Sequence, residues 1–248
     1  MEESNHPLLE VRHICKRFGG VTALEDISIT VHKQEVVGLV GDNGAGKSTL
    51  IKIIAGALPM DSGTTYVDGK PVRIRSPRHA KALKIETVYQ DLALCDNLNA
   101  TLNIFLGRYQ FMFRLGLFGV INKRDMGREA EKIINRIGAE IPNPKTLVRY
   151  LSGGQRQGVA IGRTMHTEPR LIILDEPTAA LGVGETKKVL KLIVGLRSQG
   201  IAVIFISHTL QEVFETADRV VVLRNGRKVG DKLVRETSIQ EIIHLMIG

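Results

Sequence analysis

The chain has 248 residues, enough for one large domain or two small ones. Hydrophobic residues make up 43% of it and aromatic residues only 4%, with no tryptophan, so the composition supports a core and argues against a surface that stacks on carbohydrate rings. The formal net charge of +8 suits an anionic partner such as a nucleotide, a nucleic acid or a lipid surface. The basic residues are scattered rather than massed in a tail, which argues against nucleic acid.

The cysteines and the lengths of the apolar runs indicate whether the chain is expected in the cytoplasm, outside the cell or in a membrane. Cys15 and Cys95 have no CxxC pair or histidine cluster beside them, so no zinc site is expected. We expect free thiols in a reducing cytoplasm, with a single disulfide as the alternative. The polar opening MEESNHPLLE is unlike a signal peptide. The longest apolar runs fall far short of the ~20 residues that span a membrane, so we expect a soluble chain that meets a membrane only through a partner.

Apolar bursts bounded by turn residues alternate with helical patterns, which predicts an α/β architecture with a largely parallel sheet. Buried strands are expected at Glu35–Gly41, Arg170–Glu176 and Ile201–Ser207, because each is a short, nearly continuous apolar run. A helix from about Lys47 to Ala57 should follow the first of these strands.

Between Gln90 and Tyr150 the pattern changes from sheet to helix. Apolar residues recur at helical spacing over Lys123–Gly138, which predicts an amphipathic helix. We therefore expect a helical insertion in the sheet domain.

The C-terminal segments return to β structure. A hairpin should turn at Asn225-Gly226, since this dipeptide favours the tight turns that join two strands. A final helix should begin at Ser238, where Glu241 completes a capping box.

The sequence GDNGAGKST matches the pattern G-x-x-x-x-G-K-[ST], after a predicted strand and before a predicted helix. Its backbone N–H groups and the helix N-terminus should cradle phosphates. Lys47 should reach the β and γ phosphates, and the Ser48 hydroxyl should ligate Mg²⁺. The alternative is a glycine-rich turn without a ligand. The predicted phosphate-binding residues are Gly41, Asp42, Asn43, Gly44, Ala45, Gly46, Lys47, Ser48 and Thr49.

The apolar strand LIILDE ends in two carboxylates. Asp175 should lie beside Mg²⁺, the usual arrangement in P-loop NTPases. Glu176 can turn toward the γ-phosphate at the strand end and there orient and deprotonate the attacking water. The alternative for Glu176 is a capping carboxylate.

The sequence LSGGQ at Leu151–Gln155 is followed by LDEP at Leu174–Pro177. Lying between the phosphate-binding loop and the Asp-Glu strand, these motifs resemble the signature of ATP-binding cassette (ABC) ATPases, over nearly the whole chain. The resemblance implies one domain of residues 1–248. It would have a P-loop NTPase core with a mainly parallel sheet, an antiparallel β subdomain and an inserted α-helical subdomain at about 91–165.

Three further residues match landmarks of this family. Gln90, in VYQDLAL, resembles the Q-loop glutamine that touches Mg²⁺ and senses the transmembrane partner. His208, in FISHTL, resembles the switch histidine that contacts the γ-phosphate. Phe18, in KRFGGVTAL, resembles the aromatic residue that stacks on adenine, with a place in the core as the alternative.

In this family two cassettes pack head to tail, and the P-loop of one and the LSGGQ turn of the other enclose one ATP. The resemblance therefore implies a nucleotide-dependent homodimer with ATP and Mg²⁺ as cofactors. The residues that should bind the partner's nucleotide are Ser152, Gly153, Gly154 and Gln155. The implied catalytic residues are Glu176, His208 and Lys47, and the implied Mg²⁺ ligands are Ser48, Gln90 and Asp175.

One position departs from the family pattern. After DEPT the family usually reads Ser-Ala-Leu-Asp, whereas here the residues are AALG, with Gly182 in place of the aspartate that reaches across the dimer. We expect looser coupling between the two nucleotide sites, without an effect on nucleotide binding.

Longer stretches narrow the resemblance to bacterial monosaccharide importers of the ribose, xylose and fructose type. They include FGGVTALEDIS, SPRHAKALKIETVYQDLAL, NIFLGR and the AALGVGE variant. The resemblance implies an ATPase subunit on the cytoplasmic face of the inner membrane, driving integral permease subunits and, indirectly, serving a periplasmic sugar-binding protein. Many relatives carry two fused cassettes, so one cassette implies a homodimer.

The stretch Gly107–Arg124 concentrates aromatic residues between basic ends. We expect it to pack within the helical insertion. A docking surface for the membrane subunit and a patch lying on lipid are the alternatives.

Two other functions compete with transport. A non-transport ABC ATPase acting on DNA or ribosomes usually carries long coiled-coil insertions or two cassettes, and neither occurs here. A regulatory nucleotide-binding module without turnover conflicts with the presence of Lys47, Asp175, Glu176 and His208.

Overall fold

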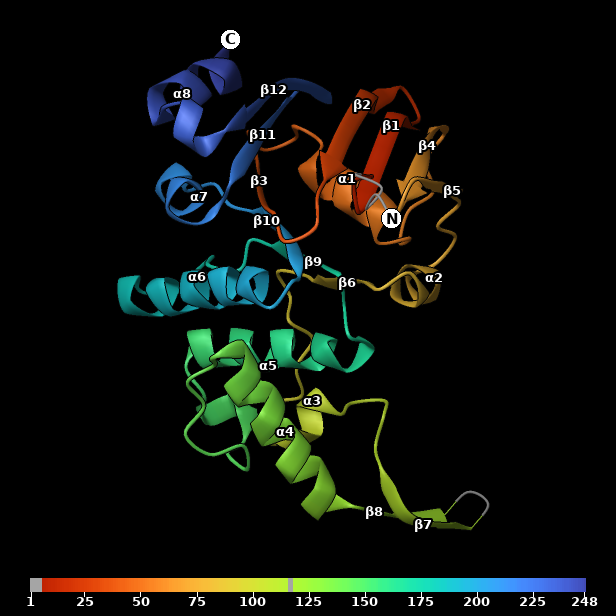
Figure 1. Ribbon diagram of the computed structural model, residues 1–248, viewed down its shortest axis with the longest axis vertical. Helices are drawn as coiled ribbons and strands as arrows, with labels where there is room; N and C mark the ends of the chain where they lie inside the picture. Colours follow the sequence, from red (N-terminus) through yellow and green to blue (C-terminus); the bar gives the residue numbers. More distant parts are fainter. Residues whose placement is uncertain (1–5, 116–117) are drawn as a thin grey trace, which may run out of the picture.

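The computed structural model describes residues 6–115 and 118–248. In this part of the chain, a six-stranded sheet runs through the centre in the order β12-β11-β3-β10-β9-β6 (Figure 1). Neighbouring strands are parallel, except that β12 pairs antiparallel with β11. The strands are β3 (Val36–Val40), β6 (Ile85–Val88), β9 (Leu171–Asp175), β10 (Ala202–Ile206), β11 (Arg219–Arg224) and β12 (Arg227–Leu233). The predicted strands β3, β9 and β10 are confirmed to within one residue at each end.

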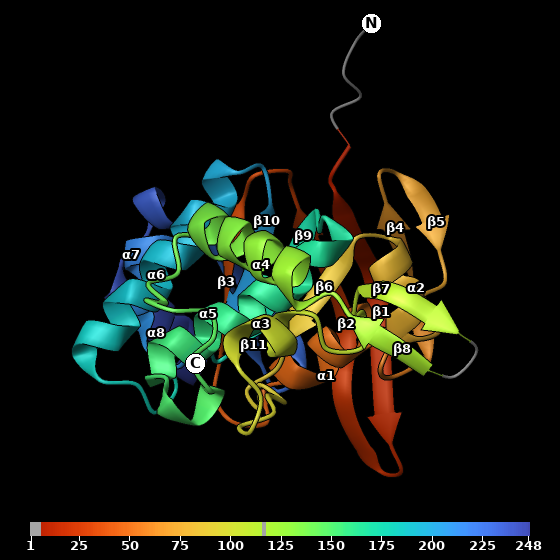
Figure 2. The same ribbon diagram turned by 90° about the horizontal axis from the view of Figure 1, so that it is seen from below.

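A second, antiparallel sheet has the order β2-β1-β4-β5 within the described residues. Its strands are β1 (Leu9–Phe18), β2 (Val21–Val31), β4 (Ser62–Val67) and β5 (Lys70–Val72). Helix α1 (Lys47–Ile54) lies between the two sheets and buries Leu50, Ile51 and Ile54 against both (Figure 2). The predicted mainly parallel sheet and antiparallel subdomain are thus both present.

Helices cover the other face of the central sheet. They are α5 (Gly153–Thr164), α6 (Val183–Ser198), α7 (Leu210–Thr216) and α8 (Ile239–Ile247). Their apolar faces form one cluster with strand residues such as Ile172, Val203 and Phe205. Both faces of the parallel strands are therefore covered, which explains why these strands read as continuous apolar runs.

A third cluster joins α5 to the inserted helices α3 (Ala100–Ile104) and α4 (Lys123–Ile137). The predicted amphipathic helix ends where Gly138 takes a left-handed conformation. The buried residues of this cluster lie between 100 and 159, and the limits of 91–165 for the insertion stay a prediction.

A short helix, α2 (Pro77–Ala82), precedes β6. Short 3-10 helices cover Val148–Tyr150, Met165–Thr167 and Val234–Glu236.

The aromatic stretch Gly107–Arg124 forms a hairpin. The expectation that it packs within the insertion is confirmed for Tyr109 and Ile121, which pack against the cluster of the inserted helices, and is wrong for the exposed side chains of the hairpin. Strands β7 (Phe111–Leu115) and β8 (Phe118–Ile121) project from the helices (Figure 1). Met112 is 71% exposed and Phe113 62%. A pair of strands has too little apolar surface of its own to bury such side chains. Gly116 and Leu117 lie outside the described residues.

The C-terminal predictions are confirmed with one difference. Asn225 and Gly226 both have positive φ, as a two-residue hairpin turn requires. Ser238 caps α8 by accepting a hydrogen bond from the Glu241 backbone N–H. In a capping box the Glu241 carboxylate would accept from the backbone N–H of Ser238. Here it accepts instead from the side-chain hydroxyl of the preceding residue, Thr237. Cys15 and Cys95 are free, as expected.

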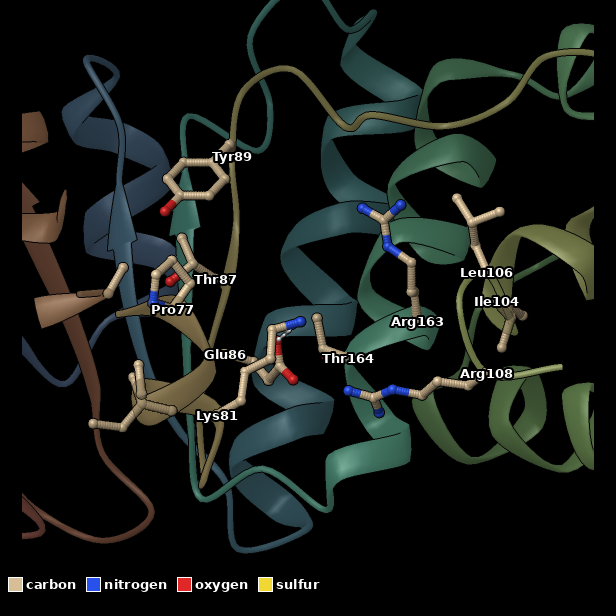
Figure 3. Close-up of a pocket in the computed structure, with 13 residues that line it drawn as sticks. Pro77, Lys81, Glu86, Thr87, Tyr89, Ile104, Leu106, Arg108, Arg163 and Thr164 are labelled. Atoms are coloured by element: carbon tan, nitrogen blue, oxygen red, sulfur yellow. Dashed lines mark ion pairs between the residues drawn. The ribbon is translucent and has the colours of Figure 1, made fainter. Parts of the chain in front are cut away.

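A groove of about 310 Å³ lies between the β6 edge and the inserted helices (Figure 3). Ile104 and Leu106 give it an apolar wall, and Arg108 and Arg163 point into it from the same side. On the opposite wall, Glu86 is 4% exposed and pairs with Lys81 at 3.3 Å.

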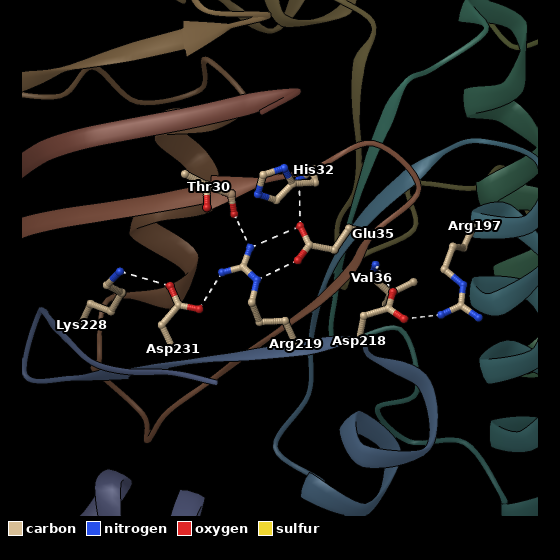
Figure 4. Close-up of polar contacts among 9 residues, drawn as sticks. All are labelled: Thr30, His32, Glu35, Val36, Arg197, Asp218, Arg219, Lys228 and Asp231. Carbon is tan, nitrogen blue, oxygen red and sulfur yellow. Dashed lines mark hydrogen bonds and ion pairs between the residues drawn. The ribbon is translucent and has the colours of Figure 1, made fainter. Parts of the chain in front are cut away.

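The two sheets are tied together by the guanidinium group of Arg219 (Figure 4). Its Nε lies 2.7 Å from the Glu35 carboxylate and its Nη1 2.6 Å from that of Asp231, and it donates to the Thr30 carbonyl of β2 at 2.5 Å. Next to it, Asp218 accepts from the Val36 backbone N–H at 2.9 Å. Because Arg219 and Glu35 are each only 11% exposed, removing one leaves a charge without its partner.

We expect Arg219→Met to lower the free energy of unfolding by about 3–5 kcal/mol, because it leaves the buried Glu35 carboxylate uncompensated. The exposed pair Arg227–Glu25 is the matched control, and Arg227→Met should change stability by only about 0–1 kcal/mol. Urea unfolding measures both. Equal losses in the two variants would contradict the structural role of Arg219.

Candidate functional site

The phosphate-binding loop predicted at Gly41–Thr49 joins β3 to α1. Gly41, Gly44 and Gly46 have φ of 147°, 82° and 102°, which side chains other than glycine rarely adopt. A Cβ on Gly46 would lie 2.6 Å from Leu24 Cδ2 and 2.8 Å from the Ala23 carbonyl oxygen. Helix α1 has no side-chain cap and no acidic residue in its first turn, so its free N–H groups remain available to an anion.

Lys47 and Ser48 occupy the first turn of α1 and differ in exposure. Lys47 is buried, and its Nζ donates to the carbonyl oxygens of Gly41 and Asp42 at 2.6 and 2.9 Å. Burial lowers the pKa of this ammonium group. The carbonyl oxygens of the loop thus accept the hydrogen bonds that Lys47 would donate to a phosphate oxygen if an anion were bound in the loop. The Ser48 side chain is exposed.

The carboxylates predicted at the end of β9 lie on the loop side of the sheet. Glu176 has a φ of 52°, and its backbone N–H donates to Ile206, the last residue of β10. This turn brings the Glu176 carboxylate to 2.8 Å from His208 Nε2. The sequence predicted that both residues face the γ-phosphate, and the structure brings them into direct contact.

Sequence reasoning missed the residue that holds this pair in place. The Glu212 carboxylate on α7 accepts hydrogen bonds from Thr178, two residues after Glu176, and from Ser207, next to His208, at 2.6 and 2.8 Å. Both hydroxyls are buried. The only signal in the sequence was a glutamate in the turn after His208, and nothing local distinguished it from a helix-capping residue.

Asp175 ends β9 beside the parallel strand β6, where Val88 lies opposite Leu174. Burial and the neighbouring Glu176 carboxylate raise the pKa of Asp175. Gln90 follows β6 and is exposed at the same edge. Within the described residues no cluster of three His, Cys, Asp or Glu side chains could hold a metal alone. A hydroxyl, an amide and a carboxylate do suit Mg²⁺ when substrate phosphates complete its shell.

Phe18 ends β1 and is 49% exposed, so a place in the core is excluded. Lys16 Nζ lies 5.5 Å from the centre of its ring. Phe18 pairs with Val21 at the start of β2, the strand whose Ala23 and Leu24 abut Gly46 of the loop. An aromatic face is therefore available next to the phosphate-binding loop.

The LSGGQ turn begins α5. Ser152 is the N-cap and forms a capping box with Gln155. The Gln155 side chain also donates to the Glu140 carbonyl at 3.0 Å, so here it orders the turn. Farther along α5, buried Gln157 donates to the Pro177 carbonyl at 2.6 Å and links this helix to the Asp175–Pro177 segment. Among the hydrogen bonds of the described residues, none joins 41–49 to 151–155.

Comparison with known proteins places this geometry in a family. Residues 24–179 match the model of the family described as ABC transporter. The chain is 44% identical over 239 residues to a xylose/arabinose import ATP-binding protein of Sulfolobus acidocaldarius, covering 96% of this chain and 93% of that one. It is 41% identical over 242 residues to a ribose import ATP-binding protein of Escherichia coli, covering 98% of this chain but 47% of that one. The chain thus spans about half the length of the ribose import relatives.

Solved structures agree with these matches. An ATP-binding cassette of an ABC transporter in its ADP conformation superposes with a TM-score of 0.84 at 26% identity, covering 98% of this chain and 99% of that one. A nucleotide-free cassette gives a TM-score of 0.82 at 27% identity, with coverages of 98% and 96%.

Because the pKa of Asp175 is raised, this group should lower the free energy of unfolding of the ligand-free protein by an amount that depends on pH. The folded state binds this proton more tightly than the unfolded chain, so stability falls as pH rises from the ordinary pKa of aspartate, about 4, to the raised value. We expect Asp175→Asn to raise Tm at pH 7 by about 2 °C, a small effect because solvent screens a partly exposed group. Near pH 3 the variant should match the wild type.

Thermal unfolding without nucleotide or Mg²⁺, at both pH values, measures this effect. Glu131→Gln on the exposed face of α4 removes one charge elsewhere and serves as the control. A Tm for Asp175→Asn that is equal to or below the wild-type value at pH 7 would contradict the prediction.

Proposed function

Because the chain belongs to the ABC transporter family, we propose that it is the ATP-hydrolysing subunit of a membrane importer. The observation that carries this proposal is the contact between Glu176 and His208 at 2.8 Å, at the edge of the sheet where β3 enters the phosphate-binding loop. A carboxylate and an imidazole there can act on a water molecule that attacks the terminal phosphate.

Each side chain of the site has a task in this proposal. The loop N–H groups and Lys47 bind the phosphates, and Phe18 stacks on adenine. Ser48, Gln90 and Asp175 would hold Mg²⁺, which neutralises phosphate charge when bound. Glu176 orients the water and takes its proton, while His208 turns from Glu176 toward the γ-phosphate. Glu212 braces the segments that carry both residues.

We infer that two copies act together, head to tail. The LSGGQ turn and the phosphate-binding loop lie on different parts of the chain, the first on the insertion and the second between the sheets. The N-terminus of α5 offers Ser152 and the N–H groups of Gly153 and Gly154, which suit a phosphate. These donors would bind ATP that is held by Lys47 of a second copy. The effect of Gly182 on coupling between the sites stays a prediction.

The groove between β6 and the inserted helices is the proposed docking site for a membrane subunit. None of the helices in residues 6–115 and 118–248 is long and apolar enough to cross a bilayer. Arg163, which lines the groove at the end of α5, donates to the carbonyls of Leu92 and Ala93, just after Gln90. A partner segment in the groove would therefore act on Gln90 and on the helix that begins at Ser152.

The hairpin β7–β8 extends this docking surface. It follows Arg108 of the groove closely along the chain, and its Met112 and Phe113 are exposed. An apolar hairpin beside an apolar and basic groove suits a membrane subunit better than solvent.

The transported substrate is proposed from the relatives, whose names give ribose and xylose/arabinose import. We propose monosaccharide import, with the chain bound peripherally to permease subunits at the cytoplasmic face of the membrane and a periplasmic sugar-binding protein delivering the sugar. The substrate rests on similarity, since fold alone does not determine it. Sugar uptake that is lost on deletion of the gene and restored by this chain is the test.

We expect Glu176→Gln to reduce the ATPase rate by about 10²–10⁴-fold, because the amide cannot take a proton from water. ATP-bound dimer should accumulate, since binding persists without hydrolysis. Phosphate release and light scattering after gel filtration measure the two effects, with Glu131→Gln as the charge-matched control. Hydrolysis at the wild-type rate would exclude Glu176 as the base.

We expect Arg108→Glu or Leu106→Glu to reduce co-purification with the membrane subunits at least tenfold, because each places a negative charge in the groove. Arg235→Glu, after β12, makes the same charge change as Arg108→Glu at a site away from the groove and the hairpin, and it is the matched control. The ATPase rate of the isolated chain should stay within twofold of wild type in all three. Equal co-purification of the three variants would show that the partner docks elsewhere.

A further inference from the structure

Phe18 lies at the end of strand β1, beyond the point where that strand has partners on both sides. The pairing of β1 with β4 ends at Cys15, opposite Ser62, whereas its pairing with β2 continues to Phe18, opposite Val21. The last three residues of β1 therefore need a contact other than the β4 ladder to hold them from that side.

The carboxylate of Asp61, the residue before β4, supplies this contact. Its Oδ1 lies 2.7 Å from Lys16 Nζ, and its Oδ2 accepts a hydrogen bond of 2.7 Å from the Arg17 backbone N–H. The Asp61 backbone N–H also donates to the Cys15 carbonyl at 3.0 Å. The bond from Lys16, and then that from Arg17, hold the pKa of the Asp61 carboxyl below its usual range. One ionised carboxylate thus fixes both residues that precede Phe18.

The ammonium group of Lys16 lies over one face of the Phe18 ring. Its Nζ is 5.5 Å from the ring centre, within the range of a cation–π contact. Lys16 is only 8% exposed, whereas Phe18 is 49% exposed. Because the buried cation occupies one face of the ring, a planar ligand can stack only on the other.

The cation has two effects on a base that stacks on the free face. It restricts the rotation of a side chain at the surface, so less conformational entropy is lost when the base binds. It also draws the negative charge of the ring face toward itself, which reduces the repulsion between the free face and the π electrons of the base. Both effects act on the base and not on the phosphates, which the phosphate-binding loop holds.

We propose that Lys16, held by Asp61, is a positioning residue that sets the affinity of the site for the base of the nucleotide. This inference rests on the proposed function, in which adenine stacks on Phe18. Lys16 does not touch the nucleotide, because its Nζ is bound to Asp61 and the Phe18 ring lies between the ammonium group and the base. Its contribution is therefore absent for a phosphate ligand that has no base.

Isothermal titration calorimetry with ADP and with pyrophosphate, each with Mg²⁺, tests this role without requiring hydrolysis or a dimer. Both ligands offer two phosphates to the phosphate-binding loop, and only ADP has a base. Lys16→Met removes the charge and keeps a side chain of similar length. The Kd for ADP should rise by about three- to tenfold, the range of a lost cation–π contact and weakened stacking. The Kd for pyrophosphate should stay within twofold of the wild-type value.

Three further variants complete the experiment. Asp61→Asn, at a side chain that is 44% exposed, cannot accept both hydrogen bonds and should also weaken the binding of ADP alone. Phe18→Leu should raise the Kd for ADP, and adding Lys16→Met to it should raise that Kd by less than twofold more, because Lys16 acts through the ring. Lys132→Met, at an exposed position on α4, is the matched control and should change neither Kd.

An equal rise in Kd for ADP and pyrophosphate in Lys16→Met would show that the residue supports the fold or acts on phosphate, and would overturn the inference. An effect of Lys16→Met that is as large without the Phe18 ring as with it would do the same. Weaker ADP binding in Phe18→Leu with unchanged binding in Lys16→Met would overturn this inference and leave the proposed function intact. If Phe18→Leu bound ADP as tightly as the wild type, the assignment of adenine to Phe18 would fail, and this inference with it.

Discussion

The parallel pairing of β10 with β3 on one side and β9 on the other is the constraint on which the site depends. In this register Ile206 lies opposite both Leu39 and Asp175. The carboxyl ends of the strands therefore meet at one edge, where β3 enters the phosphate-binding loop, β9 delivers Asp175 and Glu176, and β10 delivers His208. Ligands bind at this edge in open α/β sheets. A shift of one residue in the register would turn the strand side chains to opposite faces.

Helix α5 connects the regions that must respond to one another. Its N-terminus carries the LSGGQ turn, and its middle is bonded to the Pro177 carbonyl through Gln157. Near its C-terminus, Arg163 is bonded to the segment after Gln90. A hydrogen-bonded helix moves as a rigid body more readily than it bends, so a displacement at the groove is transmitted to the turn. The same helix thus touches the proposed docking groove, the proposed site for a second copy and the strand end that carries the proposed hydrolytic residues.

The charges of the ligand-free site are balanced within the chain. Lys47 is bonded to loop carbonyls, and Glu176 to His208. Each of these groups has an internal substitute for a contact that nucleotide would make. In the proposed function, nucleotide binding therefore exchanges contacts rather than creating them, and the free energy available for closure of the proposed dimer is the difference between the two sets.

The sequence by itself determined the elements and motifs whose cause is local. The strands β3, β9 and β10, helix α4, the Asn225-Gly226 hairpin and the glycine positions of the phosphate-binding loop all follow from apolar runs, periodicity and backbone freedom. The resemblance carried by LSGGQ and LDEP added the antiparallel sheet and the remaining landmarks.

The tertiary structure decided what depends on pairs that are distant in sequence. The partners of Glu212, the link from Arg163 to the segment after Gln90, and the exposure of Phe18 and of the β7–β8 hairpin were not visible in any local pattern. A glutamate in the first turn of a helix has the same sequence signature whether it caps its own helix or reaches a neighbouring one. Only the packing of α7 onto the sheet brings Glu212 to Thr178 and Ser207, because burial of its apolar face, and not local preference, sets those distances.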